Sequence, residues 1–217
     1  LRDGILQGFD RQGRVLLGGD VAASRVHQRI TTAERAFLAN EGSLAEIATL
    51  RAMARNPAGA EGQTQAMIEL KAVDGAYPLV GAVELDDGSA LAMTLGAGGA
   101  AVDQLLLDRL GLETGDRVRV GTHDITIART IVREPDKLAS QASYGPRVLI
   151  SIATLEKTGL AAPGSLTRWH YRILLPGGET MPAEELAAFS ERLRTGLPQA
   201  GFTAADRRDP TPGARRA

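Results

Sequence analysis

The sequence LKAVDGAYPLVG, residues 70–81, marks the point at which this chain changes character. Before it, residues 64–73 read as a strand, with Ala66, Ile68 and Leu70 on one face. Residues 75–78 carry the Gly and Pro that break a strand. Strands dominate the sequence that follows, so residues 70–81 form a junction between two differently built parts of the chain.

Upstream of this junction, the sequence signals one helix clearly. Thr31 followed three residues later by Glu34 forms a capping box, and residues 40–42 supply the stop. Residues 43–55 are ambiguous, because Ser43 and Glu46 could form a second capping box, while residues 47–55 could also extend as a strand. Periodicity does not decide a segment this short. A strand is also predicted over residues 20–23.

Downstream of the junction, residues 79–138 are predicted to be rich in strands. Alternation of apolar and polar residues and the turn residues between them indicate these elements. They are a strand at 80–85 closed by the turn Asp86-Asp87-Gly88, a helix at 105–110 ended by Gly111, and a hairpin of residues 117–120 and 125–132, with His123-Asp124 in its turn.

A mixture of helices and strands returns after residue 138. Residues 166–175 give the cleanest strand, with an apolar face and a face formed by Arg168, His170 and Arg172. A strand at 148–150 and a helix at 152–157 precede it. Pro182 starts a second helix with the buried stripe Leu186, Phe189, Leu193 and Leu197, residues 202–205 read as extended, and the tail from Asp206 is predicted to be disordered.

These elements predict an α+β fold with a discontinuous mixed α/β domain and a smaller β-rich insertion. The discontinuous domain comprises residues 1–78 plus 139–217, and the inserted domain comprises residues 79–138.

Composition excludes several classes of function. The formal net charge of the 217 residues is -1 and aromatic residues make up 4%, which argues against a uniformly basic or base-stacking nucleic-acid surface. The chain has no cysteine, which removes disulfides, thiolate nucleophiles and Cys-based zinc sites. We therefore expect no nucleic-acid partner.

No residue pattern indicates a catalytic, cofactor or metal site. His27, His123 and His170 lack metal-ligand spacing and are expected to be exposed or half-exposed. Gly18-Gly19-Asp20 followed by Ser24 resembles a hydrolase start only faintly, because no G-x-S-x-G turn is present. We expect no catalytic, cofactor or metal residues, and the sequence leaves the substrate-binding residues unknown.

Other conspicuous clusters have structural explanations. Residues 96–99 are Gly-rich but lack the Lys-Ser/Thr of a phosphate-binding loop, which favours a flexible loop. The carboxylates at 86–87 belong to a turn, and Glu184-Glu185 complement a helix dipole. Arg207-Arg208 and Arg215-Arg216 read as a solvated basic tail, with contact to anionic lipid head groups as the alternative.

The chain begins at Leu1, shows no signal peptide, and lacks the about 20 consecutive apolar residues that cross a bilayer. We expect it to be a domain excised from a longer protein.

Several segments resemble YbbP-like ABC transporter permeases. Residues 70–81 resemble their KAVD-x-x-YPL-x-G stretch, residues 103–121 their LL-x-RLGL-x-x-GD segment, and residues 145–151 their GPRVL-x-S strand. Residues 16–20 and 48–53 also fit. The segments follow the family's order across nearly the whole chain.

The resemblance implies a permease of the MacB/FtsX type, whose extracytoplasmic domain lies between the first two transmembrane helices and is divided as described above. It favours a strand over residues 47–54. It also implies a cell inner membrane location with this domain periplasmic, a separate cytoplasmic ATPase and a permease dimer. Hinges are expected near Gly75 and Lys137, because these residues lie between the two parts of the chain.

The same resemblance implies that ATP-driven motion extrudes a hydrophobic or lipid-like substrate, or operates a periplasmic partner such as a lipase, thioesterase or chaperone. No cofactor and no enzymatic activity are implied for the domain. A free-standing periplasmic binding module and an esterase-like hydrolase are the alternatives.

Overall fold

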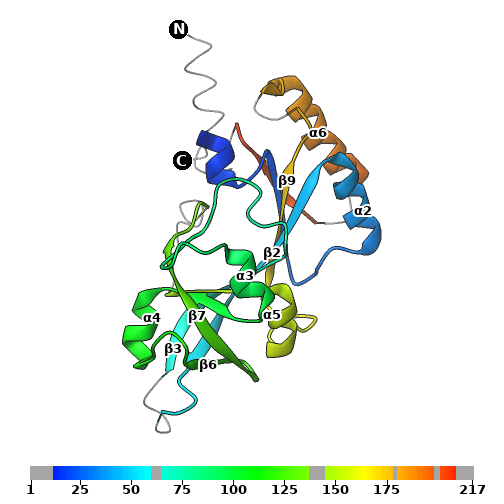
Figure 1. The fold of residues 1–217 in the computed structure, drawn as a ribbon. Helices are drawn as coiled ribbons and strands as arrows, with labels where there is room; N and C mark the ends of the chain where they lie inside the picture. Colours follow the sequence, from blue (N-terminus) through cyan, green and yellow to red (C-terminus); the bar gives the residue numbers. More distant parts are fainter. Residues whose placement is uncertain (1–11, 60–64, 137–144, 178–179, 198–200, 209–217) are drawn as a thin grey trace, which may run out of the picture.

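The computed structural model describes residues 12–59, 65–136, 145–177, 180–197 and 201–208. Helices are interspersed among the strands along them (Figure 1). The strands are β1 (Val21–Val26), β2 (Ser43–Arg55), β3 (Gln65–Val73), β4 (Glu84–Leu85), β5 (Ala100–Val102), β6 (Arg117–Val120), β7 (His123–Arg133), β8 (Arg147–Ser151), β9 (Arg168–Leu174) and β10 (Thr203–Asp206), and the helices are α2 (Thr32–Glu41), α3 (Leu91–Gly96), α4 (Gln104–Leu110), α5 (Ile152–Thr158) and α6 (Ala183–Gly196).

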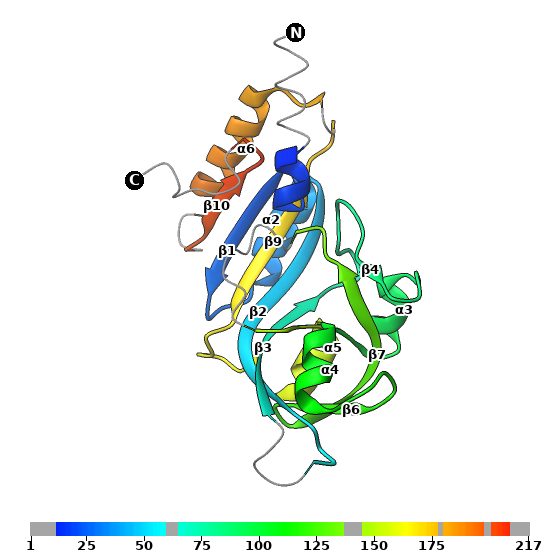
Figure 2. The ribbon, with the colours of Figure 1, turned by 90° about the vertical axis from the view of Figure 1, so that its left-hand side faces the viewer.

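The strands form one mixed sheet in the order β10-β1-β9-β2-β3-β8-β5-β7-β4, and β6 joins β2 to β7. Most neighbours are antiparallel, but β3 runs parallel to β8 and β5 runs parallel to β7. The long strand β2 contacts β9 along its first half and β3 along its second half, so it connects the two ends of the molecule (Figure 2). The predicted α+β class is confirmed.

Helices cover the sheet differently at its two ends. Helices α2 and α6 lie beside β1, β9 and β10, whereas α3, α4 and α5 surround the strands of the other end (Figures 1 and 2). The larger apolar core includes Leu38 of α2, Phe189 of α6 and Tyr171 of β9. The smaller core lies on the opposite side of β2 and β3, where Ile47 and Val73 contact Tyr77, Leu85 and residues of α3.

The sequence patterns that predicted helix ends at Thr31, Gly111 and Pro182 are confirmed by the structure. The Thr31 hydroxyl accepts the Glu34 amide at 3.2 Å, and the Glu34 carboxylate accepts the Thr31 amide at 2.7 Å, so the capping box is formed. Gly111 ends α4 with a φ of 61°, a left-handed conformation that favours glycine. Pro182 precedes α6, whose Leu186, Phe189 and Leu193 are buried as predicted.

Residues 43–55 form a strand, so the second capping box is not used. The reason is tertiary, because β2 hydrogen-bonds to β9 through residues 43–49 and to β3 through residues 47–55. Two neighbouring strands satisfy more backbone groups than a local cap does, and this outweighs the helical signal.

Three local predictions were wrong in part. The strand expected at 80–85 is reduced to Glu84–Leu85, and the strand expected at 20–23 runs instead from Val21 to Val26. The Gly-rich stretch at 96–99 runs from the last residue of α3 through a turn to β5, which agrees with a loop there, although α3 and β5 themselves were not predicted. The hairpin turn is Gly121-Thr122, because His123 already pairs with Val120.

The segment predicted to be inserted shares the sheet with the rest of the chain. Strand β5 pairs with β8, and β6 pairs with β2. The division into residues 1–78 plus 139–217 and residues 79–138 therefore stays a prediction.

Candidate functional site

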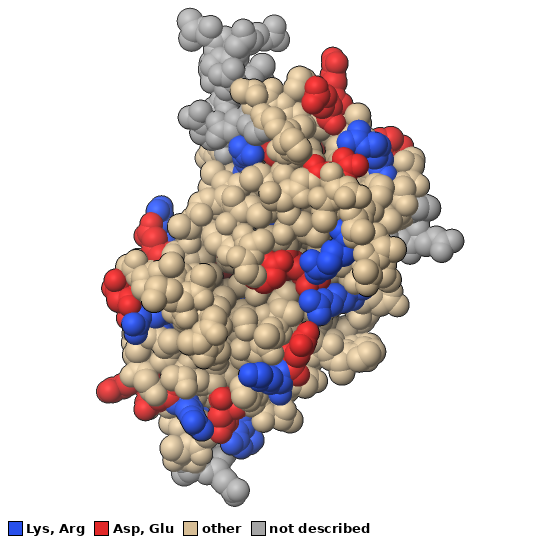
Figure 3. All heavy atoms as spheres, turned by 45° about the vertical axis from the view of Figure 1, so that its right-hand side comes forward, with Lys and Arg blue, Asp and Glu red and all other residues tan. Residues whose placement is uncertain are grey.

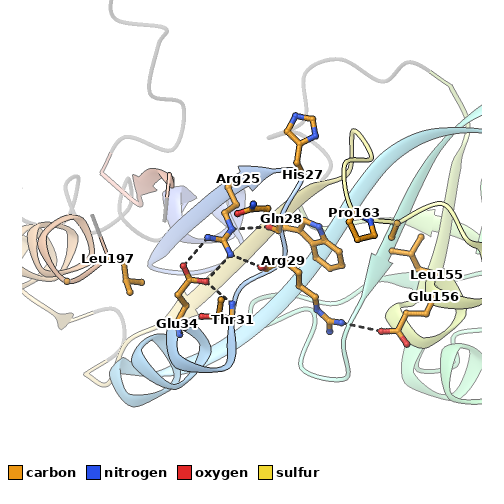
Figure 4. A pocket seen from close by; sticks show the side chains of 13 residues that line it. Arg25, His27, Gln28, Arg29, Thr31, Glu34, Leu155, Glu156, Pro163 and Leu197 are labelled. Carbon is orange, nitrogen blue, oxygen red and sulfur yellow. Dashed lines mark hydrogen bonds and ion pairs between the residues drawn. The ribbon is translucent and has the colours of Figure 1, made fainter. Parts of the chain in front are cut away.

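A groove of about 870 Å³ lies between the end that carries α2 and α6 and the end that carries α5. Charged side chains of both signs gather at mid-height on this face (Figure 3). The groove is lined by the connection between β1 and α2, by α5 and the loop after it, and by the end of α6 (Figure 4). It draws on residues from both ends of the sheet.

Arg25 and Glu34 form one wall of this groove. The Arg25 guanidinium donates to both Glu34 oxygens, at 3.0 Å and 2.9 Å, and its side chain is only 7% exposed. It also donates to the carbonyls of Gln28 and Arg29, which fixes the backbone before α2. Burial alone would raise the pKa of Glu34, but hydrogen bonds from Arg25 and the Thr31 amide lower it. This wall is rigid and charged.

Arg29 crosses the groove to α5. Its guanidinium donates to Glu46 at 2.6 Å and to Glu156 of α5 at 3.2 Å (Figure 4). The same group lies 5.2 Å from the centre of the Trp169 ring, a cation–π contact. Hydrogen bonding to the buried Glu46 raises the pKa of Arg29. Since the Arg29 side chain remains 43% exposed, a ligand in the groove could still reach it.

The rest of the lining combines the polar residues His27, Gln28 and Thr31 with an apolar part. Leu155, Pro163, Trp169 and Leu197 contribute to it, beside the backbone of Gly196. A Cβ at Gly196 would lie 2.9 Å from the Phe37 ring, so this end of α6 packs closely on α2. A groove with apolar surface and one half-exposed arginine suits an amphipathic ligand or a protein segment.

A second cluster of charges is buried at the junction near residues 70–81. We call Lys71, Tyr77, Glu134, Asp136 and Arg147 the junction cluster. The Lys71 ammonium donates to the Tyr77 hydroxyl at 2.8 Å and to the Asp136 oxygens at 2.9 and 3.0 Å, and it pairs with Glu134. The Tyr77 hydroxyl donates to Asp136 at 2.7 Å, and Arg147 Nε donates to Glu134 at 3.1 Å.

The junction cluster contains equal numbers of cationic and anionic side chains, and all of them are almost completely buried. Each of its four charged side chains is at most 5% exposed. Burial raises the pKa of Tyr77, so this hydroxyl stays protonated and remains a donor. Burial alone would also raise the pKa of Asp136, but the Lys71 charge and the Tyr77 hydroxyl lower it. Glu134 and Asp136 are therefore held against β3 as the chain leaves β7.

The three histidines remain apart from any metal site. Within the described residues, no group of three or more His, Cys, Asp or Glu side chains could hold a metal ion. His27 is exposed and contacts the Ser165 carbonyl at 2.8 Å, and His123 is half-buried. His170 is half-exposed by surface area, yet the surrounding protein and the nearby Arg172 hold its pKa well below the usual value. Its Nε2 lies 2.8 Å from the Thr49 hydroxyl.

The faint hydrolase pattern does not assemble. Ser24 lies within strand β1 opposite His170, not on a sharp turn that would expose a nucleophile. Asp20 is fully buried in an ion pair with Arg207. The turn at residues 86–88 and the acidic first turn of α6 have the structural roles expected for them.

The basic cluster at Arg207-Arg208 is not a solvated tail. Arg207 is 2% exposed, and Arg208 pairs with Asp206 at 2.6 Å. The expectation of disorder from residue 206 was therefore wrong for residues 206–208, because β10 and Asp20 provide partners that are distant in sequence. Arg215-Arg216 lie outside the described residues.

Comparison with known proteins identifies one similar protein sequence. The chain is 32% identical over 111 residues to the uncharacterized ABC transporter permease YbbP of Escherichia coli (strain K12), a match that covers 51% of this chain. The chain is homologous to part of a YbbP-type permease. It corresponds to 13% of the length of YbbP. No protein-family model matches it.

Solved structures share the fold of this YbbP relative. The periplasmic region of MacB from Actinobacillus actinomycetemcomitans superimposes with a TM-score of 0.57 at 10% identity, covering 90% of this chain and 92% of the other. The extracellular domain of the ABC-type transporter YknZ from Gram-positive bacteria gives 0.55 at 10% identity, covering 86% and 100%. The fold is thus that of the extracytoplasmic domains of such transporters. No helix in the described part of the chain is long and apolar enough to cross a membrane.

Sequence reasoning missed the junction cluster, and it also missed the ion pairs of Arg25 with Glu34 and of Arg29 with Glu46 and Glu156, which we call the groove network. The family resemblance pointed to Lys71 and Tyr77, but their partners Glu134 and Asp136 lie more than fifty residues away. A signal did exist, since two acids, Glu134 and Asp136, stand beside the expected hinge at Lys137. Lys137 itself lies outside the described residues.

Proposed function

We propose that this chain is the periplasmic domain of an inner-membrane ABC transporter permease and that it transmits conformational change driven by a separate cytoplasmic ATPase. The observation that carries the proposal is the match to YbbP, supported by a fold shared with two transporter domains. The chain itself contains no phosphate-binding loop, so ATP would be hydrolysed by the partner subunit. In the full-length protein we expect a permease dimer.

In this proposal, the two predicted domains are the parts that move relative to each other. Residues 79–138 would turn relative to residues 1–78 and 139–217, with hinges near Gly75 and Lys137. The junction cluster contains residues from both sides of each hinge in the sequence and ties the end of β7 to β3. A buried, closely packed cluster favours a few discrete arrangements over continuous bending.

A distance measurement in the membrane tests the proposal. These 217 residues contain no cysteine, so once any cysteine elsewhere in the permease has been replaced, Met93→Cys on α3 and Arg194→Cys on α6 would place one spin label on each part at positions 72% and 76% exposed. In the full-length permease with its ATPase, trapping ATP should shift the label distance distribution. An ATPase variant unable to bind ATP is the control, and an unchanged distribution in the active complex would contradict the proposal.

We place substrate or partner contact in the groove that Arg29 crosses. Two versions compete, extrusion of a hydrophobic or lipid-like substrate and operation of a periplasmic lipase, thioesterase or chaperone. The apolar lining near Trp169 suits the first, and the charged wall at Arg25 and Glu34 suits the second. Lipid that copurifies with the wild-type chain but not with a Leu197→Glu variant would favour the substrate. A periplasmic protein retained by the wild type and lost with Arg29→Glu would favour the partner.

The esterase alternative has a direct test. Hydrolysis of a chromogenic ester that disappears in Ser24→Ala would support it, and absence of hydrolysis by the wild-type chain would end it. The position of Ser24 inside a strand argues against this alternative.

A further inference from the structure

The segments by which the described chain enters and leaves the sheet lie against each other. Residues 12–17 form a short helix before β1, and residues 207–208 follow β10. A Cβ on Gly13 would lie 2.1 Å from the Arg207 carbonyl oxygen, so the two backbones are in contact and the position requires glycine. The two segments are separated by almost the whole sequence.

One buried carboxylate holds these segments together. Asp20 is fully buried and accepts the Arg207 guanidinium at 2.6 Å. Arg14 of the short helix lies 3.2 Å from the same carboxylate, and the Leu175 amide donates to it at 2.9 Å. The Arg207 amide also donates to the Asp20 carbonyl at 3.0 Å, and its guanidinium reaches the Met181 carbonyl at 2.8 Å.

This arrangement lies at one end of the pair formed by β1 and β10. Strand β10 has four residues, ends the strand order and pairs antiparallel with β1, with Val21 opposite Asp206. The chain therefore enters β1 and leaves β10 at the same end of the pair. A pull that separates the two segments would load the interstrand hydrogen bonds one at a time, starting at Val21 and Asp206.

We propose that Asp20, Arg14 and Arg207 form a clasp that makes the entering and leaving segments move as one body. Force arriving through either segment then passes into β1 and β9 instead of peeling β10 from the sheet edge. The ion pair lies one residue beyond Val21 and Asp206, at the first point that such a pull would load. This role in transmitting force rests on the proposed function, whereas the clasp itself is a property of this chain alone.

Hydrogen exchange tests the clasp in the 217-residue chain. Combining Asp20→Asn with Arg207→Gln should speed amide exchange in residues 203–206 at least ten-fold while β2 and β3 change less than two-fold. Arg208→Gln is the matched control, because it removes a neighbouring ion pair that is 39% exposed. Unchanged exchange in β10 would overturn the clasp, and so would an equal change in every strand.

A double-cysteine variant, compared in its oxidised and reduced forms, distinguishes loss of the clasp from general misfolding. Asp20→Cys with Arg207→Cys introduces the only cysteines, at positions whose backbones are hydrogen-bonded and within disulfide reach. The oxidised form should regain wild-type protection of β10 and unfold in one event when pulled from its two ends. The reduced form should show an earlier event at lower force, and identical behaviour of the two forms would overturn the clasp.

The same pair separates this inference from the proposed function. In the full-length permease, labels attached at positions 93 and 194 through unnatural amino acids that do not react with thiols should show the ATP-dependent change in the oxidised form and lose it in the reduced form. Its persistence in both forms would overturn the transmitting role. If the permease without the cysteine pair shows no ATP-dependent change, the proposed function fails, while hydrogen exchange still decides whether the clasp exists.

Discussion

The junction cluster and the groove network contain similar charged groups in different surroundings. In the junction cluster, Lys71 and its acids are almost completely enclosed. In the groove, Arg29 and Glu156 are 43% and 64% exposed. Water screens the second set and not the first, so the same kinds of ion pair should contribute very differently to stability. The difference suggests a fixed element at the junction and an exchangeable surface in the groove.

Removing the cation of the junction cluster should have the largest effect. Lys71→Met would leave the buried carboxylates of Glu134 and Asp136 without their ammonium partner. We expect the free energy of unfolding in urea to fall by about 3–5 kcal/mol. Arg133→Met, which removes an exposed ion pair with Glu84, is the control. A loss below about 1 kcal/mol would mean that water already reaches the cluster.

Removing one hydroxyl should have an intermediate effect. Tyr77→Phe keeps the ring but deletes the contacts of the hydroxyl with Lys71 and Asp136. We expect a loss of about 1.5–3 kcal/mol, because both partners are charged and buried. Thermal and urea denaturation would measure it. A neutral result would show that Lys71 and Asp136 hold each other without the tyrosine.

The pH dependence of stability sharpens the contrast further. His170 lies near Arg172 and Lys71, and burial keeps its pKa well below 6.5 in the folded state. The unfolded chain binds a proton at this residue below about pH 6.5, so stability should fall with decreasing pH from 7 to 5, by at most about 1.4 kcal/mol per pH unit. His170→Gln should flatten this slope in urea melts at several pH values.

The smallest effect is expected in the groove. Glu156→Gln removes the contact with Arg29, which keeps its hydrogen bonds to Glu46. We expect a change in unfolding free energy of at most about 1 kcal/mol, reduced further by salt. Urea titrations at low and high salt would measure it. A loss as large as that of Lys71→Met would refute the distinction between the two regions.

Interactions between residues close in sequence made some elements of this fold predictable from the sequence. The capping box at Thr31 and Glu34 and the glycine at 111 act within a few residues, and the structure contains both. The alternation around Trp169 and Tyr171 also predicted the buried face of β9. Residues 43–55 show the limit, because their helical cap competes with two strands that pairing brings from elsewhere.

The sequence by itself determined the ends of several helices, the alternation of β9 and of the β6–β7 hairpin, the absence of cysteine chemistry and the likeness to YbbP-type permeases. Only the tertiary structure decided which charges are buried together. Lys71 meets Asp136, Asp20 meets Arg207 and Arg29 meets Glu156 across 65, 187 and 127 residues. The strength of an ion pair depends on distance and on exclusion of water, and the sheet supplies both by joining strands that are far apart in the chain.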